Sequence, residues 1–553
     1  MKNSSSSIYR ASAHALSLLL ITFLLVSVSP SQQPGKEGIP FLRLHGTATQ
    51  LIVDGKPILM LGGELGNSSA SSVEYMRPLW DKLTAMHLSM LVVPVYWELI
   101  EPSEGTYDFS VVDSMILAAR AHGLKVVLLW FGSWKNSMSC YVPAWIKTDA
   151  RRFPRARTSD GRAQEILTPF SRTNMETDAR AFASFMKHLR ALDGNNHTVV
   201  LVQVENEIGM IPQARDFCRE ANEAYRAEVP GDLMAYLAKN KDRLTPELRQ
   251  ARENAGAKPA GDWEEVFGKG MQTEEIFMAW YFARYTNHVA EEGKKEYPLP
   301  MYVNAALIRP GYKPGQYPSA GPLPHLFDIW KAGAPAIDFL APDIYFKNFA
   351  EWLGRFDATG NAVFIPEVAN SQSMANAFFA FGEHHAMGYS PFSIESLRNP
   401  ADNQVAEAYD VLHQLEPLIL EHQGTPTIAG VLLDSALQTA RVEMGNYVIH
   451  FRHEYSWKYA ERVGADTPRV GGMIIQLAPD EFLVAGTGLL ATFWPRSEEA
   501  GTVGYLSIDE GRYVDGKWIA GRRLNGDQNN QGRELHLPLG SFGIQRVRLY
   551  TYR

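Results

Sequence analysis

Two glutamates stand at the ends of apolar runs and have the chemistry of an acid–base pair. Glu207 ends the run VVLVQVENE, which begins at Val199, and Glu367 follows the apolar residues of AVFIPEV. A continuous apolar run is typical of a strand buried on both faces, where an ionised side chain is costly unless it has a partner. One protonated and one ionised carboxyl group are what cleavage of a glycosidic bond requires.

The segments around these glutamates predict an α/β fold. Between residues 58 and 395, short apolar runs alternate with amphipathic stretches, as in repeated βα units. Eight candidate strands can be counted: 58–65, 89–97, 125–134, 199–207, 300–307, 338–346, 362–370 and 388–395. Eight parallel strands close a (β/α)8 TIM barrel, whose catalytic groups lie at the C-terminal ends of the strands. Glu207 and Glu367, on the fourth and seventh strands, would meet there.

Turn and cap signals locate further elements. Asp54-Gly55 between two apolar runs predicts a hairpin before the barrel. Ser72 has the place of an N-cap for a helix over 72–87, and Gly123 lies just past the last apolar turn of a helix in the segment 110–125. The segment 211–273 is longer than a barrel loop requires, and long loops there usually shape a site.

The last part of the chain predicts a different architecture. After about Glu421 the helical period disappears, and alternating residues with glycine turns indicate a small antiparallel β-sandwich. This domain can bind polysaccharide or brace the barrel. The aromatic segment 455–464 does not decide between these roles, and we favour bracing. The predicted order is a signal peptide (1–31), the barrel with its N-terminal hairpin (32–424) and the β-sandwich (425–553).

The N-terminal segment predicts export. Lys2 and Arg10 precede an apolar run of fourteen residues, Ala15 to Val28, which suits a signal peptide. A bilayer span needs about 20 residues. We therefore expect a periplasmic or secreted protein. Export permits a disulfide between Cys140 and Cys218, but two separate thiols are the favoured interpretation.

Composition excludes several classes of partner. The net charge of −8 is spread along the 553 residues, so neither a nucleic-acid surface nor a basic membrane patch is indicated. The chain has no cluster of cysteine and histidine at metal-ligand spacing. We predict a carbohydrate substrate with no metal and no cofactor, and the sequence leaves the oligomeric state open.

The motif QVENEIG resembles the acid/base motif of clan A glycosidases, and in particular that of glycoside hydrolase family 35, the β-galactosidases. The resemblance implies that Glu207 is the acid/base and that Asn206 binds the sugar next to the cleaved bond. VYWELIEPSEGTYDF is similar to the second-strand signature of that family. LGGEL, WFGSWKN, APDIYF, IPEVAN and GYSPFSIE resemble its bacterial branch with an extra C-terminal β-domain, which places Glu367 at the nucleophile position.

Other polar and aromatic residues near the strand ends are candidate sugar contacts. Aromatic rings stack on the C–H faces of sugars, while amides and charged groups bind hydroxyls. Trp97, Trp134 and Tyr345 are the stacking candidates, and Asn206, Asn304, Lys135 and Glu98 are the hydroxyl-binding candidates. Each aromatic can equally pack in the core. Tyr345 is the residue best placed to donate a hydrogen bond to the nucleophile, and Glu395 is either a hydroxyl contact or part of a structural ion pair.

The sequence therefore predicts a retaining, exo-acting β-galactosidase that acts on oligosaccharides or plant polysaccharide fragments. Two alternatives remain. The first is another clan A activity, such as a β-glucosidase or arabinosidase, because one fold carries many specificities. The second is a sugar-binding protein without catalysis.

Overall fold

The computed structural model describes residues 38–358, 360–454, 467–497, 499 and 501–553. The predicted signal peptide (1–31) and the aromatic segment 455–464 lie outside the described residues. Within the described ranges, no helix is long and apolar enough to cross a membrane. Cys140 and Cys218 are separate free thiols, as the sequence favoured.

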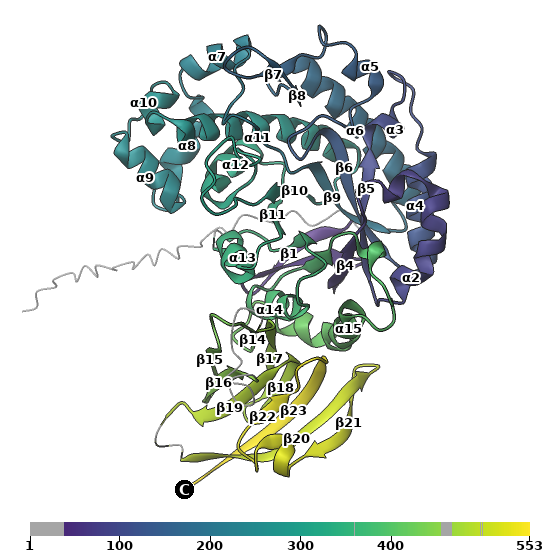
Figure 1. The fold of residues 1–553 in the computed structure, drawn as a ribbon, viewed down its shortest axis with the longest axis vertical. Coiled ribbons are helices and arrows are strands. Elements are labelled where there is room, and N and C mark those ends of the chain that lie inside the picture. The colour runs from purple at the N-terminus through teal and green to yellow at the C-terminus, as the bar shows by residue number, and fades with distance from the viewer. Residues whose placement is uncertain (1–37, 359, 455–466, 498, 500) are drawn as a thin grey trace, which may run out of the picture. The chain divides into compact units, whose positions relative to one another are not determined.

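Eight parallel strands form a closed barrel, which confirms the predicted fold class. Around the barrel the order of the strands is β10-β11-β12-β13-β4-β5-β6-β9 (Figure 1). The strands are β4 (Met60–Glu64), β5 (Met90–Tyr96), β6 (Lys125–Lys135), β9 (Val199–Asn206), β10 (Met301–Ala306), β11 (Phe339–Ile344), β12 (Ile365–Val368) and β13 (Gly388–Pro391). Seven of the candidate strands contain one of them in full, and β6 extends one residue beyond the candidate strand 125–134.

The helices follow the strands along the chain. They are α1 (Val73–Met76), α2 (Trp80–Thr84), α3 (Trp97–Ile100), α4 (Ser110–Ala121), α5 (Ala144–Lys147), α6 (Arg172–Asp193), α11 (Met271–Glu296), α12 (Phe327–Gly333), α13 (Phe349–Asp357), α14 (Ala375–Glu383) and α15 (Gln404–His422). The helix predicted from Ser72 begins there, since the Ser72 side chain accepts a hydrogen bond from the Tyr75 backbone N–H. A 3-10 turn over Arg77–Leu79, which contains Pro78, separates α1 from α2.

Short sheets and extra helices decorate the barrel. The Asp54-Gly55 turn, with φ of 50° and 78°, joins β2 (Ala48–Val53) to β3 (Lys56–Ile58), beside β1 (Phe41–His45). Two further strands, β7 (Arg155–Arg157) and β8 (Ala163–Leu167), pair with each other. The long segment after β9 forms α7 (Arg219–Arg226), α8 (Gly231–Lys239), α9 (Pro246–Asn254) and α10 (Trp263–Phe267). In Figure 1, α8, α9 and α10 lie together at one side of the barrel.

The C-terminal part consists of two antiparallel sheets that share an apolar core. The larger has the order β14-β17-β18-β23-β20-β21 and the smaller β15-β16-β19-β22. Their strands are β14 (Ile428–Leu433), β15 (Thr439–Met444), β16 (Tyr447–His453), β17 (Val470–Ala478), β18 (Glu481–Thr487), β19 (Leu489–Pro495), β20 (Thr502–Val514), β21 (Lys517–Leu524), β22 (Leu535–Leu537) and β23 (Gly543–Tyr552). Phe451 of one sheet and Phe482 of the other both belong to this core, so the sheets pack face to face.

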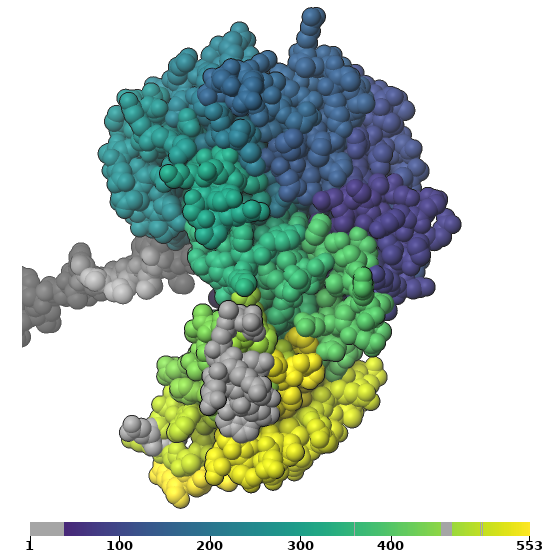
Figure 2. Space-filling view, in the orientation of Figure 1, coloured from purple at the N-terminus to yellow at the C-terminus, as the bar shows by residue number. Residues whose placement is uncertain are grey.

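Backbone contact joins the barrel to these sheets. A Cβ atom on Gly430 of β14 would lie 2.7 Å from the Phe379 carbonyl oxygen of α14, and one on Gly382 would lie 2.9 Å from the Ala429 carbonyl oxygen. Only glycine permits helix and strand to approach so closely. In Figure 2 the green surface of the α14–α15 region adjoins the yellow-green C-terminal sheets. This packing supports the bracing role.

We therefore expect Gly430→Ala to destabilise the protein. The added methyl group must push α14 away from β14, and overpacking of this kind costs about 1–3 kcal/mol. Thermal unfolding should show a lower Tm. Gly231→Ala, where a Cβ would have no atom within 4 Å, is the matched control and should not lower Tm. An unchanged Tm in Gly430→Ala would contradict direct packing of the helix on the strand.

Candidate active site

The ends of the barrel strands gather the predicted glutamates at one mouth. Glu367 on β12 is in register with Asp343 on β11, and Glu207 follows the last residue of β9. One carboxylate oxygen from each of these three residues lies within 4.8 Å of the other two. Glu207 and Glu367 are each only 5% exposed. The fold thus brings together the two residues that the sequence singled out.

The backbone after β9 separates the two glutamates of the motif Glu205-Asn206-Glu207. Regular strand alternation would point Glu205 and Glu207 to the same side. Both residues instead have left-handed backbone, with φ of 64° and 45°. Glu205 accepts a hydrogen bond from the Trp134 backbone N–H at 2.7 Å, and its buried carboxyl group interacts with Asp178. Glu207 alone joins the group at the mouth, so only one carboxylate of the motif lies near Asp343 and Glu367.

Glu207 has the environment of a general acid. The Asn136 side-chain amide donates a hydrogen bond to its carboxylate, and the Asn304 side chain accepts one from its backbone N–H at 2.9 Å. Burial, followed by repulsion from Glu367, raises the pKa of Glu207 to about 7, against the opposing effect of Lys135. A carboxyl group with this pKa holds its proton at mildly acidic pH and can donate it to a leaving oxygen.

Glu367 lies next to Tyr345 and Glu64. The Tyr345 hydroxyl donates a hydrogen bond to Oε1 of Glu367, which confirms the contact expected from the sequence. Burial and then repulsion from Glu367 raise the pKa of Glu64 well above its ordinary value, and a neutral Glu64 can donate a hydrogen bond to Glu367. The second oxygen, Oε2, has no hydrogen-bond partner among the described residues. Glu367 therefore has one oxygen that is oriented by Tyr345 and a second that is available to a substrate.

Charge balance at the mouth depends on one ammonium group. Burial would lower the pKa of Lys135, but the carboxyl groups of Glu207, Glu367, Glu64 and Asp343 raise it. Lys135 is therefore charged and offsets part of their repulsion. The oxygens of Glu207, Asp343 and Glu367 are also the type of ligand that a hard divalent cation uses. Their spacing and the nearby ammonium group are equally suited to acid–base chemistry.

The structure corrects two of the predicted stacking residues. Trp97 and Trp134 are both 0% exposed, so no sugar can reach their rings. The Trp97 indole N–H donates to Glu101 at 3.0 Å and the Trp134 indole N–H donates to the Leu167 carbonyl at 3.1 Å. Both rings belong to the core, where apolar burial stabilises the barrel. Tyr345, at 44% exposed, is the stacking candidate that remains.

Three of the predicted polar contacts have hydrogen-bond or ion-pair partners within the protein. The Asn304 side-chain amide donates to Asn206 at 3.2 Å and to Asp343 at 2.6 Å, so Asn304 braces the site. Glu98 pairs with Lys147 at 3.1 Å. Glu395 accepts hydrogen bonds from the loop after β4, at 3.0 Å from the Gly66 N–H and 2.5 Å from the Ser69 hydroxyl.

Asn206 keeps a free donor at the mouth. Its side-chain oxygen accepts hydrogen bonds from Gln203 at 2.9 Å and Asn304 at 3.2 Å. These two bonds fix the orientation of the amide. Its nitrogen has no partner within the part of the chain that the structure describes. This N–H group is buried beside the carboxyl pair, and a buried donor without a partner costs free energy unless a ligand or an ordered water accepts its hydrogen bond.

Sequence reasoning missed Glu64, Asp343 and Asn136. Glu64 and Asp343 are carboxylic acids at the ends of β4 and β11, the same signal that identified Glu207 and Glu367. Burial, followed by repulsion from Glu367 and Glu207, raises the pKa of Asp343 well above its ordinary value. Asn136 follows the last residue of β6 with left-handed backbone (φ 51°), and no sequence pattern predicts that geometry.

A close pair of buried carboxyl groups at the mouth of a (β/α)8 barrel is the arrangement of a glycoside hydrolase. Residues 77–240 match the glycoside hydrolase 42 family, described as beta-galactosidase. This region includes Glu207 and ends before Glu367. The resemblance to family 35 is not confirmed, since the family that matches is family 42. Residues 405–536 match a domain of unknown function, DUF5597.

Individual proteins show the same similarity. A beta-galactosidase of Xanthomonas manihotis is 26% identical over 196 residues, which span 34% of this chain and 30% of that protein. The beta-galactosidase structure from Marinomonas ef1 has 13% identity and a TM-score of 0.43, covering 65% of this chain and 60% of that chain. The one from Bacillus circulans sp. alkalophilus has 15% identity and a TM-score of 0.44, covering 66% and 57%.

We expect kcat/KM for glycoside hydrolysis to fall with rising pH as Glu207 loses its proton. The midpoint should lie near the Glu207 pKa of about 7. Because Lys135 lowers that pKa, Lys135→Met should move the alkaline limb of the kcat/KM profile upward by about one pH unit. The matched control is Lys125→Met, at the opposite end of the same strand, where the ammonium group donates to the His197 carbonyl. A limb that stays in place in Lys135→Met would contradict the charge coupling.

Proposed function

We propose that the protein is a retaining β-galactosidase that removes terminal β-galactosyl residues from oligosaccharides. The observation that carries this proposal is the closeness of the two carboxyl groups, since one carboxylate oxygen of Glu207 lies within 4.8 Å of one carboxylate oxygen of Glu367. Retaining glycosidases hold their two carboxyl groups about 5–5.5 Å apart, whereas inverting enzymes need about 6.5–9.5 Å to admit a water molecule. The similarity to beta-galactosidases supports galactose as the sugar.

The two glutamates then have separate roles in two steps. In the first, Glu367 attacks the anomeric carbon while Glu207 gives its proton to the leaving oxygen, so the glycosidic C–O bond breaks and a galactosyl ester of Glu367 forms. In the second, Glu207, now ionised, takes a proton from water, and the water oxygen replaces the ester oxygen at the anomeric carbon. Double inversion returns β-galactose. The amide N–H of Asn206 is suited to a hydroxyl of the bound sugar.

Burial of the pair favours action on chain ends. Glu207 and Glu367 are 5% exposed, and Asn206 is 0% exposed. An internal unit of a polysaccharide would have to bring chain on both sides to this depth, whereas a terminal unit brings chain on one side only. A β-glucosidase or arabinosidase would use the same pair, and a panel of aryl glycosides distinguishes these activities from a β-galactosidase.

Variants at the two glutamates test the assignment. Glu367→Gln should lower turnover of every galactoside by a factor of about 10³ or more, because a neutral amide is a poor nucleophile. Glu207→Ala should retain the first step on aryl galactosides, whose leaving group needs little protonation, and should stall in the second step. Added azide needs no base and should restore turnover, with β-galactosyl azide as the product.

Mass spectrometry provides an independent readout. A slow fluorinated galactoside should label Glu367 within the peptide FIPEVAN. A label on another residue, or α-galactose as the first product, would refute the retaining mechanism. A sugar-binding protein without catalysis would give neither label nor product.

We also propose that the protein is exported, on the evidence of the apolar run from Ala15 to Val28. Cleavage near Ser31 should then leave a mature chain that lacks the first residues. Intact-mass measurement on protein purified from its native host tests this. A mass that includes Met1 through Ser31 would overturn the proposal.

A further inference from the structure

Three adjoining cavities lead away from Glu207 across the surface of the barrel domain. The first, of about 460 Å³, is lined by Glu207, Asp343 and Tyr345. The second, of about 540 Å³, shares Tyr312 and Tyr317 with the first. Cavities that share lining side chains are neighbours, so the second lies directly beside the catalytic cavity.

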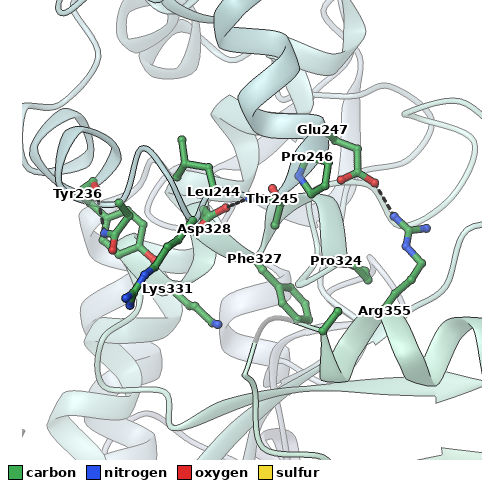
Figure 3. A pocket seen from close by; sticks show the side chains of 13 residues that line it. Tyr236, Leu244, Thr245, Pro246, Glu247, Pro324, Phe327, Asp328, Lys331 and Arg355 are labelled. Atoms are coloured by element: carbon green, nitrogen blue, oxygen red, sulfur yellow. Dashed lines mark hydrogen bonds and ion pairs between the residues drawn. The ribbon is translucent and has the colours of Figure 1, made fainter. Parts of the chain in front are cut away.

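The third cavity, of about 510 Å³, continues the row and is drawn in Figure 3. It shares Glu247 and Arg355 with the second cavity. These two side chains form an ion pair at 2.8 Å, the dashed contact at one side of the figure. They come from α9 and α13, so the long segment after β9 supplies one wall of the row. Each cavity has the volume of a small-molecule site.

The lining of the row has the chemistry of carbohydrate recognition. Six amide side chains line it: Asn136, Asn240, Gln250, Asn254, Gln272 and Gln316. An amide both donates and accepts hydrogen bonds, as a sugar hydroxyl does. Tyr312, between the first two cavities, is 43% exposed and offers a ring face for the apolar C–H side of a sugar.

The acidic groups of the second and third cavities are paired within the protein. Glu247 pairs with Arg355 at 2.8 Å, and Asp328 accepts the Thr245 backbone N–H at 2.7 Å. Glu275 accepts hydrogen bonds from the Tyr317 hydroxyl at 2.7 Å and the Ala320 N–H at 3.1 Å. Because groups of the protein already bind these carboxylates, a cationic ligand is not required to offset their charge. The lining also contains Arg243, Arg309 and Lys331, so that with Arg355 four cationic side chains stand against five carboxyl groups. This near balance of charge, together with the six amides, favours a neutral ligand.

The position of the row relative to the two glutamates indicates which side of the cleaved bond it faces. Glu207, the proposed acid, lines the first cavity, and Glu367 is absent from its lining residues. The acid must contact the leaving oxygen, so sugars on the leaving-group side occupy the space next to Glu207. The row begins at that space.

We propose that this row of cavities binds the leaving-group portion of the substrate, and that the substrate is a neutral oligosaccharide of several units with a β-galactosyl end. The proposal rests on the proposed function and adds the length and charge of the substrate. Tyr312 stacks on a sugar between the first two cavities, and the Glu247–Arg355 pair marks the passage to the third.

The test compares an aryl β-galactoside with neutral β-galactosyl-terminated oligosaccharides from disaccharide to hexasaccharide. For the wild-type protein, kcat/KM should rise with chain length. Tyr312→Ala should lower the ratio of oligosaccharide to aryl-galactoside kcat/KM by about 5- to 10-fold, the value of one stacking contact. Arg355→Ala should lower this ratio only for the longer substrates, which reach the second and third cavities.

Tyr75→Ala is the matched control, since Tyr75 is an exposed tyrosine on α1 that lines none of the three cavities. Its length dependence should equal that of the wild type. If the aryl galactoside is cleaved and kcat/KM does not depend on chain length, the row is not a substrate site, although the proposed function stands. If no galactoside is cleaved, the proposed function itself fails. Preference for acidic oligosaccharides of equal length would overturn the neutral assignment.

Discussion

The electrostatics of four buried carboxyl groups beside one buried ammonium group constrain the rest of the site. Glu64, Glu207, Asp343 and Glu367 cannot all ionise in a space with so little water, because each added charge raises the energy of the others. Burial and mutual repulsion raise the pKa values of Glu64 and Asp343 well above their ordinary values and bring the pKa of Glu207 to about 7. The four carboxyl groups titrate as one coupled system, so a substitution at any one of them alters the titration of the others.

The barrel positions this group through strand register and a few strained residues. Parallel pairing places Asp343 beside Glu367 and Lys135 beside Asn206, so one fold provides both the repulsion and the charge that offsets it. Left-handed backbone at Glu205 and Glu207 then sends one carboxyl group into the protein and the other into the mouth. Such conformations cost about 1–3 kcal/mol each and persist only where their surroundings enforce them. Hydrogen bonds from Asn136 and to Asn304 hold Glu207 in place.

The barrel could be predicted from sequence because its signal is repeated eight times along the chain. Glu207 and Glu367 could be found because a carboxylate after a buried run conflicts with its apolar context. The sugar contacts were harder to predict. Trp97 and Trp134 stand at strand ends, as a stacking residue would, yet their side chains turn into the core, and side-chain direction there depends on helix packing. Glu64 and Asp343 are also carboxylic acids at the ends of buried runs, as Glu207 and Glu367 are. Their effect on the site depends on their closeness to that pair in the folded barrel, which the sequence does not reveal.

The C-terminal sheets and the long segment after β9 contribute to this site in different ways: the sheets pack on a helix behind it, and the segment lines the cavities beside it. The sheets pack on α14, the helix that follows β12 and Glu367, through backbone contacts at Gly382 and Gly430. Their contribution to the site is mechanical, because they fix a helix whose strand supplies the proposed nucleophile. The long segment lines the cavities on the side of Glu207. The nucleophile is thus supported by rigid packing, while the acid faces the open part of the molecule, where a leaving group must depart and water must enter.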